Sequence, residues 1–188
     1  ACNTHTTNKY EYLEKNASFR SEVLKREGGH FIKLSDGFTY YKEENTNSEK
    51  DVIMLIHGFS VPSYIWNPTY QKLKNKGFRV IALDLYGRGF SDNLDTDYTD
   101  RLMANQVLEL LNHLNINQVH LVGLSNGGRI ISQAAVLQPQ LIQSLIYVSS
   151  NSFEDIELTK DISVSADEIN EFISHYPEID SGQLDDFF

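Results

Sequence analysis

The stretch "QVHLVGLSNGG", residues 118–128, is an apolar run that ends in a serine between two glycines. Gly123 and Gly127 stand two residues before and two residues after Ser125, and a segment with helical spacing follows. A serine at a sharp strand-to-helix turn needs strained backbone angles and close neighbours, so glycine is expected where bulk would clash. The pattern predicts a nucleophile elbow, with Ser125 as the nucleophile and the N–H of Asn126 placed to donate to an oxyanion at a helix N-terminus.

Apolar runs alternate with helical segments on both sides of this turn. Four runs are predicted as strands buried on both faces: 51–58, 78–87, 118–124 and 141–150. The segments between them are predicted as helices: 62–76, 99–115 and 126–138. Upstream, residues 10–27 have helical spacing, and Asp36-Gly37 predicts a hairpin. This alternation predicts an α/β fold with a mostly parallel sheet flanked by helices.

Charge divides the chain unevenly. The 188 residues carry a net charge of −10, which argues against a nucleic-acid partner. Residues 151–188 hold eleven acidic residues and one lysine, whereas the rest of the chain is neutral. We therefore predict an N-terminal tether and helix (1–27), a core (28–150) and an acidic cap or lid segment (151–188). The cap segment is either an exposed acidic helical surface or a functional lid.

Three glycine-containing turns follow three successive predicted strands: "HGFS" (57–60), "DLYGRGFSD" (84–92) and "GLSNGG" (123–128). Ligands bind beyond the carboxyl ends of the strands in an open α/β sheet, so we expect these turns to meet at one edge. An elbow needs a second oxyanion donor from the loop after an earlier strand. The N–H of Phe59 is the best candidate for that donor.

These motifs, in this order, resemble those of the α/β-hydrolase superfamily, most closely its esterase and monoacylglycerol-lipase-like branch. The stretch "LIHGFSVPSYIWNPTYQKLKNKGFRVIALDLYGRGFSD" (55–92) carries the likeness best. The resemblance implies acyl transfer from a small-molecule carboxylic ester to Ser125, an oxyanion hole from Phe59 and Asn126, and no cofactor. It also implies that His57 shapes its loop and is not the catalytic base.

The same resemblance implies a chain order of serine, acid and histidine. The one histidine after the elbow, His175, has no buried strand before it and is expected to be a surface residue. Asp155, or Glu154 beside it, is a candidate acid; otherwise both are surface charges at the start of the cap. The catalytic base is therefore predicted to be absent from this chain, and the 188 residues alone are expected to show little or no activity.

A hydrolase core that stops at residues 141–150 lacks its last strands and leaves a sheet edge open. We expect self-association or a complementing chain at that edge, or loss of a C-terminal part. The alternative function is a non-catalytic module of the same fold, or an inactive fragment.

The N-terminal stretch "ACNTHTTNK" (1–9) resembles the end of a bacterial lipobox followed by a polar tether. A lipidated Cys2 would anchor the protein to a membrane outside the cytoplasm; the alternatives are a stray cysteine and a cytoplasmic location. No run of about 18 apolar residues predicts a spanning helix. The acidic stretch 92–100 lacks the glycine and terminal glutamate of a calcium loop, and no histidine or cysteine spacing suggests zinc, so no metal site is predicted.

Overall fold

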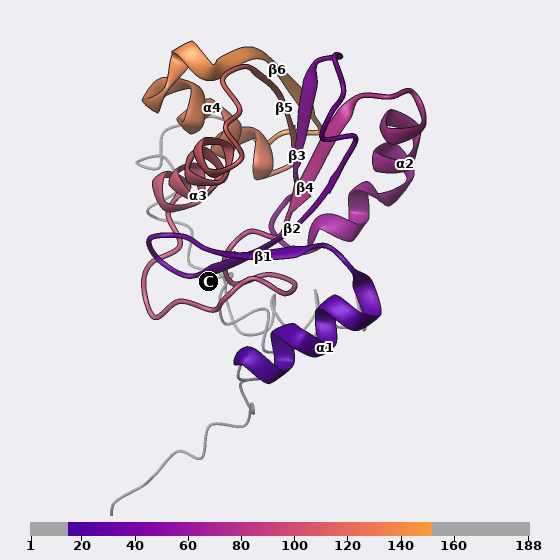
Figure 1. The fold of residues 1–188 in the computed structure, drawn as a ribbon. Coiled ribbons are helices and arrows are strands. Elements are labelled where there is room, and N and C mark those ends of the chain that lie inside the picture. Colours follow the sequence, from indigo (N-terminus) through magenta and orange to yellow (C-terminus); the bar gives the residue numbers. More distant parts are fainter. Residues whose placement is uncertain (1–14, 152–188) are drawn as a thin grey trace, which may run out of the picture. The chain divides into compact units, whose positions relative to one another are not determined.

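A computed structural model describes residues 15–151, in which six strands form one sheet (Figure 1). The strands are β1 (His30–Lys33), β2 (Phe38–Glu44), β3 (Val52–Ile56), β4 (Arg79–Leu83), β5 (Val119–Leu124) and β6 (Ile142–Val148). Their order in the sheet is β1-β2-β4-β3-β5-β6. β1 and β2 are antiparallel to their neighbours, whereas β4, β3, β5 and β6 run parallel. The predicted α/β class with a mostly parallel sheet is confirmed.

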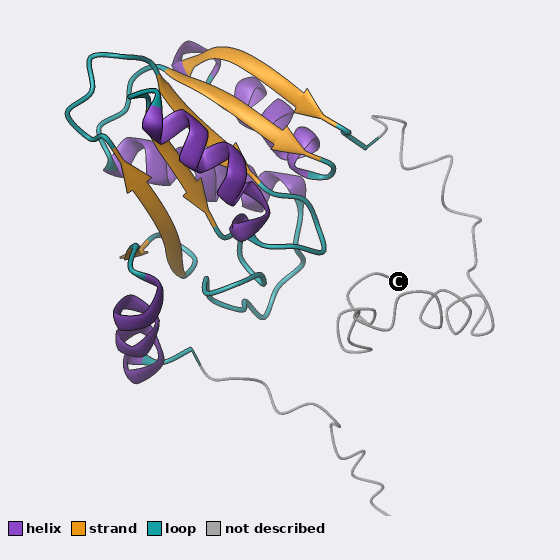
Figure 2. Ribbon diagram, turned by 90° about the vertical axis from the view of Figure 1, so that its right-hand side faces the viewer, coloured by secondary structure: helices purple, strands orange, loops and turns teal. Residues whose placement is uncertain are grey.

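Helices cover both faces of this sheet (Figures 1 and 2). They are α1 (Ala17–Glu27), the 3₁₀ turn η1 (Ser63–Trp66), α2 (Asn67–Asn75), α3 (Asp100–His113), α4 (Gly127–Leu137) and the short turn η2 (Pro139–Leu141). α2 packs on one face against β4, and α3 and α4 pack together on the other. The segment predicted as one helix over 62–76 thus opens as a 3₁₀ turn. α2 then begins at Asn67 with Pro68 in its first turn, where the missing N–H of proline is not needed.

The two faces bury two separate apolar clusters. The larger one lies under α3 and α4 and includes Met54, Ile56 and Leu121. The smaller one lies under η1 and α2 and includes Leu55, Trp66 and Tyr70. Alternate residues of β3 therefore enter opposite clusters, as the period of two along a strand requires. A strand that is buried on both faces has apolar residues at every position. The continuous apolar run "VIMLI" therefore predicts a strand from the sequence alone.

Local sequence signals set several helix ends. The side chain of Thr99 accepts a hydrogen bond from the N–H of Leu102 at 3.1 Å and caps α3. Asn16 caps α1 in the same way through the N–H of Phe19. Gly28 follows α1 with a φ of 69°, a left-handed angle that glycine adopts at no steric cost.

β6 pairs with β5 alone among the described strands. What meets its other edge stays a prediction, as do the three proposed segments of the chain. Cys2, Glu154, Asp155, His175 and the cap segment from 152 onward lie outside the described residues. No helix within residues 15–151 is long and apolar enough to cross a membrane.

Candidate active site

Ser125 stands at the turn between β5 and α4 with a φ of 51°. Residues other than glycine, asparagine and aspartate rarely adopt this left-handed conformation. The turn is held from the neighbouring strand, because the Ser125 N–H donates to the carbonyl oxygen of Val148 in β6 at 2.9 Å. The side chain is partly exposed at the carboxyl end of the parallel strands. The strained turn thus fixes a serine hydroxyl at the sheet edge where ligands of such folds bind.

The glycines of the motif stand where backbone segments cross closely. A Cβ atom at Gly123 would lie 2.5 Å from the carbonyl oxygen of Gly127. A Cβ atom at Gly127 would lie 2.6 Å from the Ile56 oxygen and 2.7 Å from the His57 oxygen. Backbone atoms cannot give way as a flexible side chain can, so glycine is required at both positions. The same contacts bring the end of β3 against the first turn of α4.

The "HGFS" loop lies beside the nucleophile. A Cβ atom at Gly58 would approach the Ser125 Cβ to 3.1 Å, so this loop passes directly next to the serine. Phe59, the predicted donor, follows Gly58 in the same loop. The N–H of Asn126 serves no hydrogen bond to another described residue and lies at the N-terminus of α4. The structure therefore brings the "HGFS" loop, the Ser125 turn and the start of α4 next to one another. An oxyanion hole formed by the N–H groups of Phe59 and Asn126 stays a prediction.

His57 is fully buried, and both of its ring nitrogens are engaged. Nδ1 lies 2.6 Å from the carbonyl oxygen of Gly58, to which it donates, and Nε2 accepts from the N–H of Leu85 at 2.9 Å. This pairing fixes the neutral tautomer. Burial lowers the pKa of His57 and outweighs the opposing effect of the nearby Asp84 carboxylate. His57 therefore joins the loop after β3 to the loop after β4 and has no nitrogen left for Ser125.

Asp84 and Arg88 fasten the same two loops together. The Asp84 carboxylate accepts from the N–H of Ser63 at 2.8 Å and from the N–H of Phe90 at 2.9 Å. The Arg88 Nε donates to the carbonyl oxygen of Phe59, and its guanidinium carbon lies 4.2 Å from the centre of the Phe59 ring. The loop that carries Phe59 is thus held by a buried carboxylate at one end and a cation at the other.

Ser125 Oγ donates a hydrogen bond of 3.0 Å to the amide oxygen of Asn151, just after β6. Asn151 N–H also donates to the Ser125 carbonyl oxygen at 3.3 Å. An amide oxygen accepts a hydrogen bond but takes no proton, so this contact orients the hydroxyl without activating it. Sequence reasoning missed Asn151. The feature of the sequence that could have indicated Asn151 is its position, just after the strand predicted to follow the elbow helix.

A serine–histidine pair does occur in residues 15–151, but at the far end of β5. His120 Nδ1 lies 2.7 Å from Ser144 Oγ, and His120 Nε2 lies 3.6 Å from an Asp51 oxygen. His120 is five residues before Ser125, or about 17 Å along the strand. This cluster cannot serve the elbow. Among the described residues, no group of three or more histidine, cysteine, aspartate or glutamate side chains could hold a metal ion.

Comparison with known proteins agrees with this fold. A family model described as the alpha/beta hydrolase fold matches residues 51–174. The chain belongs to the α/β-hydrolase fold family. This α/β hydrolase is 41% identical over 112 residues to an uncharacterised protein of Mycobacterium tuberculosis, a match that covers 60% of the chain and 31% of that protein.

Two further similarities concern hydrolases by name. The uncharacterised hydrolase YugF of Bacillus subtilis is 32% identical over 119 residues, which cover 63% of the chain and 43% of YugF. A carboxylesterase structure from the thaumarchaeon Nitrososphaera gargenis superposes with a TM-score of 0.62 at 31% identity, covering 70% of the chain and 50% of the esterase. The chain thus spans less than half the length of the curated relatives, and its similarities support a hydrolase.

Proposed function

We propose that this α/β hydrolase is a serine hydrolase of carboxylic esters that forms an acyl-enzyme on Ser125. The observation that carries the proposal is the φ of 51° at Ser125. Strained backbone of this kind costs about 1–3 kcal/mol and tends to persist where function needs it. A glycine or asparagine would relieve the strain, whereas serine supplies a hydroxyl. Similarity to a carboxylesterase supports an ester substrate.

In the proposed reaction, Ser125 Oγ attacks the ester carbonyl carbon while a base takes the hydroxyl proton. The resulting oxyanion accepts hydrogen bonds from the N–H groups of Phe59 and Asn126, and it lies at the positive end of the α4 dipole. Collapse of the intermediate breaks the bond to the alcohol, which leaves with the proton, and acylates the serine. Water then releases the carboxylic acid by the same steps in reverse order.

The base is proposed to lie outside residues 15–151. His57 is locked between Gly58 and Leu85, and His120 is bound at the other end of its strand. Asp155 or Glu154 stays the proposed acid. During acylation, the Ser125 hydroxyl has to leave its hydrogen bond to the Asn151 oxygen and form one to the catalytic base.

The Ser125–Asn151 contact also favours a second candidate, a non-catalytic member of the fold that binds through the same edge. A kinetic assay of the full-length protein with p-nitrophenyl butyrate as the substrate distinguishes the two candidates. The enzyme proposal predicts turnover that Ser125→Ala lowers by at least about a thousandfold. Ser132→Ala is the matched control, because Ser132 lies in α4 and bonds to the Gly128 oxygen. Absence of turnover from the wild-type protein would favour the second candidate, and turnover unchanged in Ser125→Ala would overturn the assignment of Ser125 as the nucleophile.

A further inference from the structure

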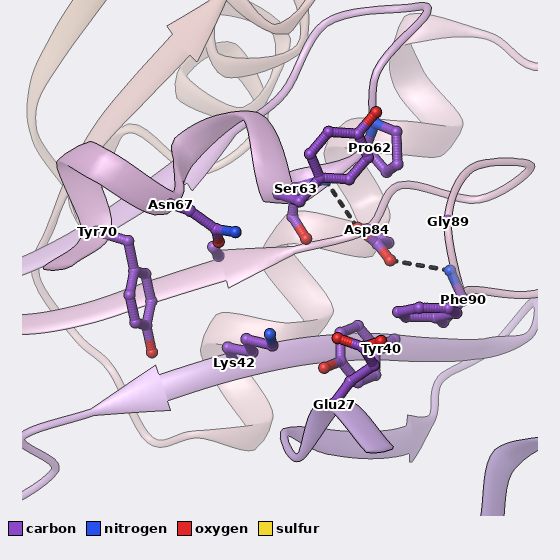
Figure 3. A pocket seen from close by; sticks show the side chains of 12 residues that line it. Glu27, Tyr40, Lys42, Pro62, Ser63, Asn67, Tyr70, Asp84, Gly89 and Phe90 are labelled. Atoms are coloured by element: carbon purple, nitrogen blue, oxygen red, sulfur yellow. Dashed lines mark hydrogen bonds between the residues drawn. The ribbon is translucent and has the colours of Figure 1, made fainter. Parts of the chain in front are cut away.

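A pocket of about 380 Å³ lies on the α2 face of the sheet, apart from the elbow. Its floor is β2 and β4, and α2 and η1 form one wall (Figure 3). Its apolar lining comes from Tyr40, Pro62, Tyr64, Ala82 and Phe90. The volume falls within the range of small-molecule sites, roughly 300–1,000 Å³. Such sites are mostly apolar and carry a few polar groups at defined positions.

The Tyr70 hydroxyl and the Lys42 ammonium line this pocket and form no hydrogen bond with a described residue. Tyr70 reaches from α2 toward the strand that carries Lys42 (Figure 3), and its side chain is only 5% exposed. Burial raises the pKa of Tyr70 above its usual range, so its hydroxyl stays a proton donor. Lys42 lies on β2 opposite Ala82 and is half-buried. A hydroxyl and an ammonium, both donors, therefore face the same space.

The carboxylates around the pocket already have partners. Glu27 bonds to the Arg26 guanidinium at 2.9 Å. Asp84 is 2% exposed and accepts from two backbone N–H groups. Lys42, by contrast, forms no ion pair with a described residue. Among the charged side chains of the lining, the Lys42 ammonium is therefore the one that forms no ion pair or hydrogen bond with a described residue.

We propose that this pocket binds a small carboxylate with an apolar body. Its carboxylate accepts hydrogen bonds from the Lys42 ammonium and the Tyr70 hydroxyl, and its apolar body lies against Pro62 and the rings of Tyr40 and Phe90. A carboxylate satisfies two convergent donors at once, and the charged donor makes the stronger bond. The apolar lining favours an organic acid over an inorganic anion.

The pocket also adjoins the loop that carries Phe59. Ser63 and Phe90 line the pocket, and both donate their N–H groups to Asp84. The apolar body of a ligand here therefore lies beside the residues that Asp84 ties together, next to the loop that carries Phe59. Binding at this pocket does not depend on Ser125 being a nucleophile.

The test is calorimetric titration of the full-length protein with benzoate, using benzamide as the matched neutral probe. We expect benzoate to bind about ten- to a hundredfold more tightly than benzamide, since one charge-assisted hydrogen bond is lost with the amide. Lys42→Met should remove the same factor and keep the aliphatic stem. Tyr70→Phe should weaken benzoate by about three- to tenfold.

Two controls locate the site. Lys72→Met changes an exposed lysine on α2 and should leave benzoate binding unchanged. Ser125→Ala should also leave it unchanged, which separates this pocket from the elbow. Equal affinity for benzoate and benzamide, full affinity in Lys42→Met, loss of binding in Ser125→Ala or no binding to the wild type would each overturn the proposal. Circular dichroism of each variant confirms that a loss of binding is not a loss of fold.

Discussion

Ser125 and Ser144 lie near opposite ends of the neighbouring strands β5 and β6, and the groups around their hydroxyls differ. Ser144 has a histidine at 2.7 Å and a carboxylate beyond it, yet it lies within the regular strand β6. Ser125 lacks a described histidine, but it has a left-handed backbone angle, a helix N-terminus behind it and a second loop beside it. Under the proposed function, the comparison teaches that a proton acceptor does not by itself make a serine a nucleophile. The fold also has to build the turn and the proposed oxyanion donors.

The largest effect is expected from placing a methyl group at the elbow. Gly127→Ala puts a Cβ atom 2.6 Å from the Ile56 oxygen and 2.7 Å from the His57 oxygen. We expect it to lower the free energy of unfolding by about 3 kcal/mol, since overpacking against backbone cannot relax locally. Urea denaturation measures the change. Val136→Ala, at a 75% exposed position of the same helix, should stay within about 0.5 kcal/mol of wild type.

The next prediction concerns the loop that carries Phe59, the proposed oxyanion donor. Arg88→Lys keeps the charge but loses the planar group that bonds to the Phe59 oxygen and covers its ring. We expect kcat/KM for p-nitrophenyl butyrate to fall by up to about a hundredfold, because a small displacement of the loop misplaces its donor. A variant with wild-type kcat/KM would show that Arg88 does not position Phe59.

His57, in the loop beside the elbow, is expected to make the stability of the protein depend on pH. Its pKa is lowered in the folded protein, so below pH about 6.5 the unfolded chain takes up a proton that the folded chain does not. The stability that His57 contributes is therefore complete above this pH and is lost as the pH falls below it. Chemical denaturation at pH 7.5 and pH 5 should show a smaller drop in His57→Gln than in the wild-type protein. His113→Gln, at an exposed position, should keep the wild-type drop.

The smallest effect is expected at the far end of β5. Ser144→Ala removes a partly exposed hydrogen bond to His120 and should cost about 1 kcal/mol or less. It should leave ester turnover unchanged, since the cluster has no turn and no oxyanion donors. A fall in turnover equal to that of Ser125→Ala would reverse the comparison between the two serines.

Much of the elbow could be predicted from sequence because its constraints are local. Apolar runs set β3 and β5, and the steric needs of one tight turn set Gly123 and Gly127. The partners of these residues were harder to predict. Asn151 and Arg88 act through contacts across loops, 26 and 29 residues away from Ser125 and Phe59 respectively. Such contacts depend on which strands become neighbours, and side-chain type alone does not fix that.

The sequence also did not predict the pocket under α2. Lys42 and Tyr70 lie on different elements and carry no motif. Only the packing of α2 over β2 and β4 brings their polar groups to one space.

The most direct test of the account is to treat the full-length protein with a fluorophosphonate and map the adduct by mass spectrometry. The account predicts one adduct on Ser125, lost in Ser125→Ala and kept in Ser144→Ala. An adduct on Ser144, or labelling that survives Ser125→Ala, would contradict it.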